Sequence, residues 1–228
     1  MGQARGFLSR VLTLVAKDIR IEWRTRDSVV TMVVFGLIVL LTFGFAFDMA
    51  VVNVGAIAPG VLWAAIAFSS TLGLSRSFSM EKDRGAIEGL LLLPVDRSTI
   101  FLAKVAANLM YMGVAEVVLV PALVVLFNLS AAHLGSLLLV VLLGSVGFAG
   151  VGTLFSAIAI HSRAREVLLP VLLLPVTTPV VLACVKVTNS IFAGFLLDEV
   201  AHWLVLLVAF DVIFLALSAL LFDYVIED

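Results

Sequence analysis

The stretch SMEKDRGAIEGLLLLPVDRST, residues Ser79 to Thr99, lies between two long apolar runs of this 228-residue chain. Five of the eight residues from Glu81 to Glu88 are charged, whereas the apolar runs on either side carry almost no charge. The stretch is therefore a polar connection between two candidate membrane spans. The pattern of apolar runs around it decides the fold class.

The composition is that of an integral membrane protein. Hydrophobic residues make up 63% of the chain and charged residues 13%, with a mean hydropathy of +1.23. Soluble globular domains carry about 25% charged residues. The first apolar run is longer than the core of a signal peptide, so we expect no cleaved leader. A single cysteine, Cys184, excludes an intrachain disulfide and most metal clusters.

Six apolar runs are long enough to cross a bilayer, which requires roughly 17–25 residues in a helix. We therefore predict an all-α polytopic domain over residues 28–225. The expected spans are residues 28–47, 54–75, 105–127, 135–160, 167–185 and 203–225.

Basic residues divide unevenly between the connections. The N-terminal segment holds six, the second loop five and the fourth loop two, whereas Lys186, in the expected fifth loop, is the one remaining. The positive-inside bias places the side with more basic residues, formed by the N-terminal segment and the second and fourth loops, in the cytoplasm. Both termini, including the short C-terminal segment 226–228, and the quoted stretch are thus expected to be cytoplasmic.

Residues 1–27 predict an amphipathic helix that lies in the cytoplasmic interface, with its cations near anionic headgroups. A basic leader that only sets topology is a compatible alternative. The apolar face comprises Leu8, Val11, Leu12, Val15, Ile19 and Trp23. The opposite face carries Arg10, Lys17, Arg20 and Arg24.

The quoted stretch predicts a short helix over residues 79–94. Ser79 can cap its start, Glu81 and Asp83 suit the positive end of the helix dipole, and Pro94 ends it. Two interpretations stay open. The segment is either a solvated loop whose charges only set topology or a docking helix held by a cytoplasmic partner.

Motifs of enzymes and nucleotide sites are absent from the sequence. It contains no G-x-x-x-x-G-K-[ST], no H-E-x-x-H, no C-x-x-C and no G-x-S-x-G. If the protein uses ATP, another subunit must bind it. This favours a transporter subunit over an enzyme.

Two acids, Glu116 and Asp211, fall inside expected spans, where a charge is costly. We expect them at similar depth, and they could line one interior cavity; the alternative is a protonated acid bonded to a neighbouring helix. Three prolines in the fifth span predict kinks, which would suit a moving helix or could equally be static. They are Pro170, Pro175 and Pro179. Four glycines between Gly144 and Gly152 predict close helix packing.

Four segments carry a family resemblance. They are APGVLWAAIAFSSTLGLSRSF (Ala58–Phe78), DRGAIEGLLLLP (Asp83–Pro94), LAKVAANLM (Leu102–Met110) and LLPVTTPVVLA (Leu173–Ala183). Their order and spacing resemble CcmB, the permease subunit of the cytochrome c maturation system. The resemblance implies an ABC-2 permease, similar to type V exporters, in which an interfacial helix precedes six spans.

The same resemblance implies that residues 79–94 form a coupling helix that docks on a CcmA-like ATPase. The implied contacts are Glu81, Lys82, Asp83, Arg84, Gly85 and Glu88, with a smaller second contact at Arg163 and Arg165. Two permease copies and CcmC-like, CcmD-like and CcmE-like partners are also implied, in the bacterial inner membrane and in contact with its lipids. No nucleic acid is expected as a partner.

By this resemblance the complex exports haem or releases a haem-loaded chaperone. ATP and Mg would bind in the ATPase, and this chain alone would bind no cofactor and no metal. His133 and His202 on the outer side, and His161 in the cytoplasm, are expected to be ordinary residues rather than haem ligands. The alternatives are an ABC-2 permease for a lipid or drug and, less favoured, a membrane enzyme using Glu116 and Asp211.

Overall fold

The chain folds as a bundle of long helices. The computed structural model describes residues 2–47, 53–83, 96–130, 134–160, 162, 164–195 and 197–225, with the backbone alone at 2–5, 77–83, 165–166 and 197. All regular elements of these residues are helical. They are α1 (Gly2–Thr25), α2 (Asp27–Ala46), α3 (Val54–Asp83), α5 (Arg97–Leu126), α6 (Leu134–Ala159), α7 (Arg165–Phe192), the 3-10 helix η2 (Leu197–Val200) and α8 (Ala201–Val225).

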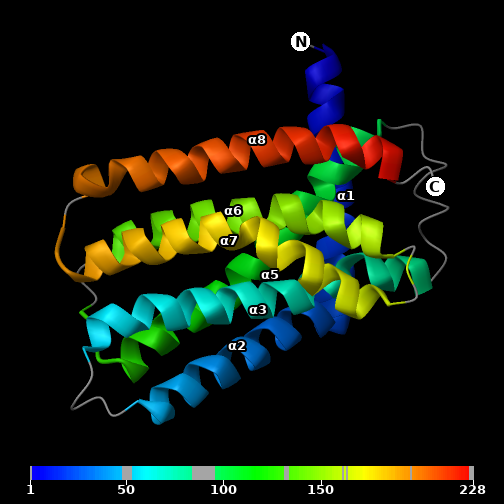
Figure 1. The fold of residues 1–228 in the computed structure, drawn as a ribbon. Helices are drawn as coiled ribbons and strands as arrows, with labels where there is room; N and C mark the ends of the chain where they lie inside the picture. Colours follow the sequence, from blue (N-terminus) through cyan, green and yellow to red (C-terminus); the bar gives the residue numbers. More distant parts are fainter. Residues whose placement is uncertain are drawn as a thin grey trace.

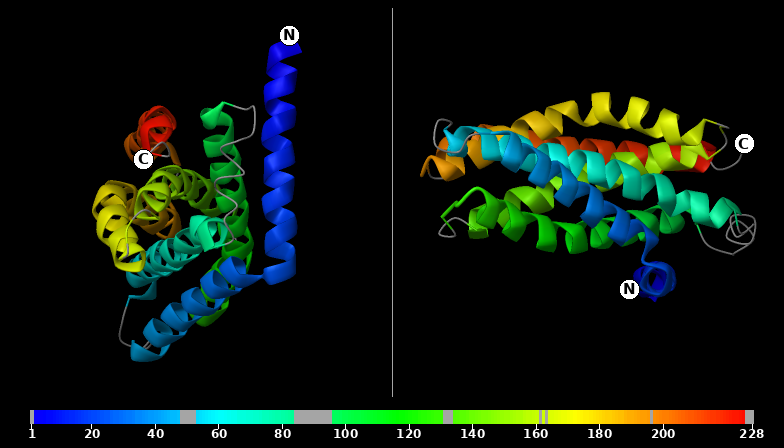
Figure 2. Two further views of the ribbon diagram at one scale, coloured as in Figure 1. Left: turned by 90° about the vertical axis from the view of Figure 1, so that its right-hand side faces the viewer. Right: turned by 90° about the horizontal axis from the view of Figure 1, so that it is seen from below.

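Six of these helices, α2, α3, α5, α6, α7 and α8, are long and apolar enough to cross a membrane. This confirms the prediction of a six-span, all-α membrane protein. The six lie side by side, and successive helices run in alternating directions (Figure 1). Helix α1 crosses the bundle near the end where α2 begins, and helix α8 ends on this same side of the bundle (Figure 2). We call it the α1 end.

Three helices are several residues longer than the predicted spans, and the first of them, α3, ends at Asp83 rather than near residue 75. Helix α5 begins at Arg97 rather than near residue 105, because Thr99, Ile100 and Phe101 already bury their side chains in the bundle. Helix α7 continues to Phe192, so the prediction that Lys186 lies in a loop is wrong. The helix extends because Val187 and Ile191 still face the core while Lys186 faces outward.

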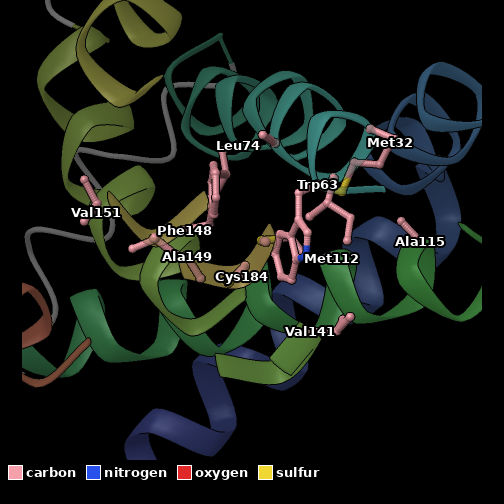
Figure 3. Packing of buried hydrophobic residues seen from close by; sticks show 14 of the residues in the cluster. Met32, Trp63, Leu74, Met112, Ala115, Val141, Phe148, Ala149, Val151 and Cys184 are labelled. Carbon is pink, nitrogen blue, oxygen red and sulfur yellow. The ribbon is translucent and has the colours of Figure 1, made fainter. Parts of the chain in front are cut away.

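Helices α3 and α6 form the centre of the bundle. In their most apolar stretches 72% of the residues are buried, against 17% for α2 and α8. Glycines allow the close approach: a side chain on Gly144 of α6 would overlap the Trp63 ring of α3 and the Cys184 thiol of α7. Figure 3 shows Trp63 and Cys184 pointing toward one another in this core. The predicted packing role of this glycine is thereby confirmed.

Candidate functional site

The described part of the expected coupling segment, Ser79 to Asp83, lies at the α1 end of the bundle. Helix α3 runs without a break through Ser79 to Asp83, so the prediction of a separate helix beginning at Ser79 is wrong. No glycine or proline occurs between Ser79 and Asp83 to stop the helix. Glu81, Lys82 and Asp83 thus form the last turn of α3.

The rest of that segment, including Arg84, Gly85 and Glu88, lies outside the described residues, as does Arg163. Arg165 is the first residue of α7, at the same end of the bundle. Here the start of α5 also meets the end of α8, because the Arg97 guanidinium donates a hydrogen bond of 2.9 Å to the Asp223 carbonyl. The docking role of these residues stays a prediction.

A buried ion pair joins α1 to α5 at this end. The Lys104 ammonium lies 2.9 Å from Asp18 Oδ2, and the two side chains are only 5% and 7% exposed. The other carboxylate oxygen of Asp18 lies 3.0 Å from Lys17, whose side chain is 36% exposed. Screening by solvent weakens this second pair but not the first. The pair is therefore a fixed contact between the two helices.

A second acid of α1 holds the start of α2. Glu22 is buried, and its Oε1 accepts hydrogen bonds from the backbone N–H groups of Ser28, at 2.8 Å, and Val29, at 2.9 Å. The first N–H groups of a helix have no partner within it and attract negative charge. Between the helices Arg26 takes a left-handed conformation with φ 57°. Glu22 thus fixes the sharp turn from α1 into α2.

Sequence reasoning missed both contacts. Lys104 had been counted among the charges that set topology, and Asp18 and Glu22 had no assigned role. The available signals were the spacing of the two acids, four residues apart within an otherwise apolar stripe, and a lone lysine inside an apolar run.

The predicted N-terminal helix exists, but only part of its apolar face is buried. Val15 is buried against the bundle beside Asp18 and Glu22, whereas Leu8, Leu12 and Trp23 are 59%, 59% and 74% exposed. The exposed group leaves an apolar surface at the α1 end. Such a surface fits a helix that lies along a bilayer.

The two acids of the spans lie on different sides of α6. Ser145 of α6 donates a short hydrogen bond to Glu116 of α5, whereas Gly147 of α6 packs against the Asp211 carboxyl of α8. Residues two apart in a helix point about 200° apart. The two acids therefore contact different sides of α6, and their lining of one cavity stays a prediction. Glu116 fits the alternative of an acid held by a neighbouring helix.

The remaining candidates have ordinary surroundings. Helix α7 continues through Pro170, Pro175 and Pro179, and its ribbon bends along its length (Figure 1). His202 is exposed and its ring packs on Trp203, with centroids 5.2 Å apart. His133 and His161 lie outside the described residues. Among the described residues no three His, Cys, Asp or Glu side chains are placed to hold a metal ion.

Comparison with known proteins identifies the family. The family profile described as "CcmB protein" matches residues 9–227. The chain is 25% identical to "Heme exporter protein B" of Bradyrhizobium diazoefficiens over 187 residues, 82% of this chain and 84% of the relative. It is 28% identical to the protein of the same name from Pseudomonas aeruginosa over 169 residues, 74% and 76% of the two chains.

The protein of that name from Escherichia coli is 32% identical over 102 residues, 45% of this chain and 46% of the relative. The family profile spans α2 to α8 completely and the larger part of α1, from residue 9 onward. All six candidate spans and most of α1 thus fall within the match. The chain is a multi-pass membrane protein that belongs to the CcmB family.

Proposed function

We propose that this chain is the permease subunit of an ATP-driven ABC complex in cytochrome c maturation. The observation that carries the proposal is the match of the CcmB family to residues 9–227. Relatives that align with three quarters or more of this chain's length bear the name heme exporter protein B. The bundle of six spans with a crossing N-terminal helix supports a transport subunit.

In this proposal the ATPase is a separate, CcmA-like subunit that holds ATP and Mg at the α1 end. The α1 end would then face the cytoplasm of a bacterial inner membrane, as the bias of basic residues toward it indicates. The ATPase grips the segment between α3 and α5, through Glu81, Lys82, Asp83, Arg84, Gly85 and Glu88. Arg163 and Arg165 add a smaller contact at the connection to α7.

Because the gripped segment joins the end of α3 to the start of α5, movement of the ATPase pulls on both helices. Helix α3 is central and α5 contacts α1, α2, α3, α6 and α8, so the pull reaches most of the bundle. Two permease copies and CcmC-like, CcmD-like and CcmE-like partners complete the assembly. The motion drives haem export or the release of a haem-loaded chaperone.

Purification of the tagged chain from its native membrane in mild detergent tests this proposal. We expect an ATPase, CcmC-like and CcmE-like proteins to co-purify, with a haem Soret band that follows the chaperone. An ATPase alone would favour an ABC-2 permease for another substrate. A chain without any ATPase would overturn the proposal.

Charge reversal tests the docking segment itself. In a strain that lacks its own permease, the combined reversal of Glu81, Asp83 and Glu88 should abolish cytochrome c maturation while the chain still reaches the membrane. The control reverses Asp198 and Glu199, two exposed acids at the opposite end of the bundle. Equal activity of both variants would contradict the docking role.

A further inference from the structure

We propose that Asp18 and Lys104 are positioning residues that make α1 and α5 move as one body when the ATPase pulls on the segment before α5. The inference rests on the proposed function. It assigns to the interfacial helix a part in transmitting motion, in addition to lying on the membrane.

The first argument is where the pair lies. Lys104 follows Arg97, the first residue of α5, by seven residues, or about 10 Å along the helix axis. The pull on the preceding segment therefore reaches Lys104 before it reaches the centre of the membrane. Helix α1 packs mainly on α5, and a smaller contact joins it to α2.

The second argument is that the ion pair fixes the position of α1 along α5. An apolar pair of similar size would stabilise a buried contact equally well or better, but it could slide. The Lys104 ammonium at 2.9 Å from Asp18 Oδ2 instead sets the register of α1 along α5. Both side chains are shielded from water, so salt screens this contact much less than it screens an exposed pair.

The third argument is the second attachment of α1. Glu22 lies one helical turn after Asp18 and binds the first N–H groups of α2. Helix α1 therefore joins the third span, through Asp18, to the first span, through Glu22. In this proposal a displacement of α5 is passed to the start of α2 through the one turn of α1 that separates Asp18 from Glu22.

The test uses the full chain in a strain that lacks its own permease. Lys104→Met removes the buried cation, and Lys17→Met removes the exposed cation from the same carboxylate. We expect Lys104→Met to lower cytochrome c maturation roughly 5-fold or more, within the range of coupling mutations. Its membrane level and its association with the ATPase should stay near those of the unsubstituted chain. Lys17→Met should mature cytochrome c normally, and Lys104→Arg should retain most of the activity.

A covalent link between α1 and α5 tests whether the Asp18–Lys104 pair is needed for joint movement of the helices or only for folding. Cysteines at positions 18 and 104, in a chain carrying Cys184→Ser, can be joined by a short bifunctional thiol reagent. We expect low maturation before cross-linking and recovery after it, because the tether restores the joint movement. Loss of the residual activity on cross-linking would show that the helices must separate and would overturn the inference.

Two further outcomes would also overturn it. Normal maturation by Lys104→Met would show that the pair is not needed. Loss of the ATPase from the purified Lys104→Met complex would show that the pair serves assembly. Failure of the proposed function looks different, because the unsubstituted chain would then neither bind an ATPase nor restore maturation.

Discussion

Asp18 in the contact of α1 with α5 and Asp211 in the contact of α6 with α8 are equally buried, each with 6% of its surface exposed. Their surroundings differ. Asp18 has a lysine on each carboxylate oxygen. Asp211 Oδ1 is buried without a hydrogen-bond partner among the described residues and packs against Gly147.

The difference follows from depth in the bundle. Near the α1 end, basic residues are abundant, and an ionised carboxylate can be compensated by a cation. In the middle of a span an ionised carboxylate is costly, so we expect Asp211 to be a neutral acid held by packing. The first contact is electrostatic and directional, whereas the second depends on the fit of helix surfaces. Substitutions at the two contacts should therefore have effects of different size and kind.

The largest effect is expected where the helix surfaces fit most closely. Gly144→Leu would drive a side chain into the Trp63 ring and the Cys184 thiol, both of which are fully buried. We expect a loss of more than about 3 kcal/mol in the free energy of unfolding and little folded protein. Membrane level and thermal unfolding in detergent measure the loss.

The matched control is Gly113→Leu on α5, where no atom lies within 4 Å of an added Cβ. This variant should reach the membrane at the normal level. If both leucine variants were equally stable, close packing around Gly144 of α6 would not contribute to the stability of the bundle.

The second effect is at the paired acid. Asp18→Asn removes the negative charge between two lysines but keeps an oxygen that can accept a hydrogen bond. We expect the free energy of unfolding to fall by about 2 kcal/mol, less than for complete removal of a buried partner. Thermal unfolding in detergent measures it. An unchanged melting temperature would show that the carboxylate charge contributes nothing.

The third effect is at the turn from α1 to α2. Glu22→Gln keeps an acceptor for the N–H groups of Ser28 and Val29 but removes the charge that favours the start of a helix. A loss of about 0.5–1 kcal/mol in the free energy of unfolding is expected. Glu22→Ala removes the acceptor as well, so its loss in the free energy of unfolding should be larger. The order of the two melting temperatures tests whether Glu22 stabilises the start of α2.

The sequence was sufficient for the six spans because apolar length and charge bias are local properties that the bilayer imposes. It was also sufficient for the existence of the N-terminal helix. It could not reveal the partners of Asp18 and Lys104, since they are 86 residues apart and meet only when α1 folds across α5. Depth along a span could be estimated for Glu116 and Asp211, but their directions around α6 depend on how the helices pack.

The smallest effect is expected at the unpaired acid. Asp211→Asn replaces a neutral carboxyl by an amide of nearly the same shape, and Gly147 leaves room for either group. Because no ion pair is lost, we expect the free energy of unfolding to change by less than about 0.5 kcal/mol. Thermal unfolding of this variant beside Asp18→Asn measures the two acids under the same conditions. An equal loss at both positions would mean that Asp211 carries a charge with a partner beyond the described residues, and the contrast between a paired and an unpaired acid would fail. A normal melting temperature combined with impaired cytochrome c maturation would instead assign Asp211 a role in transport that does not depend on stability.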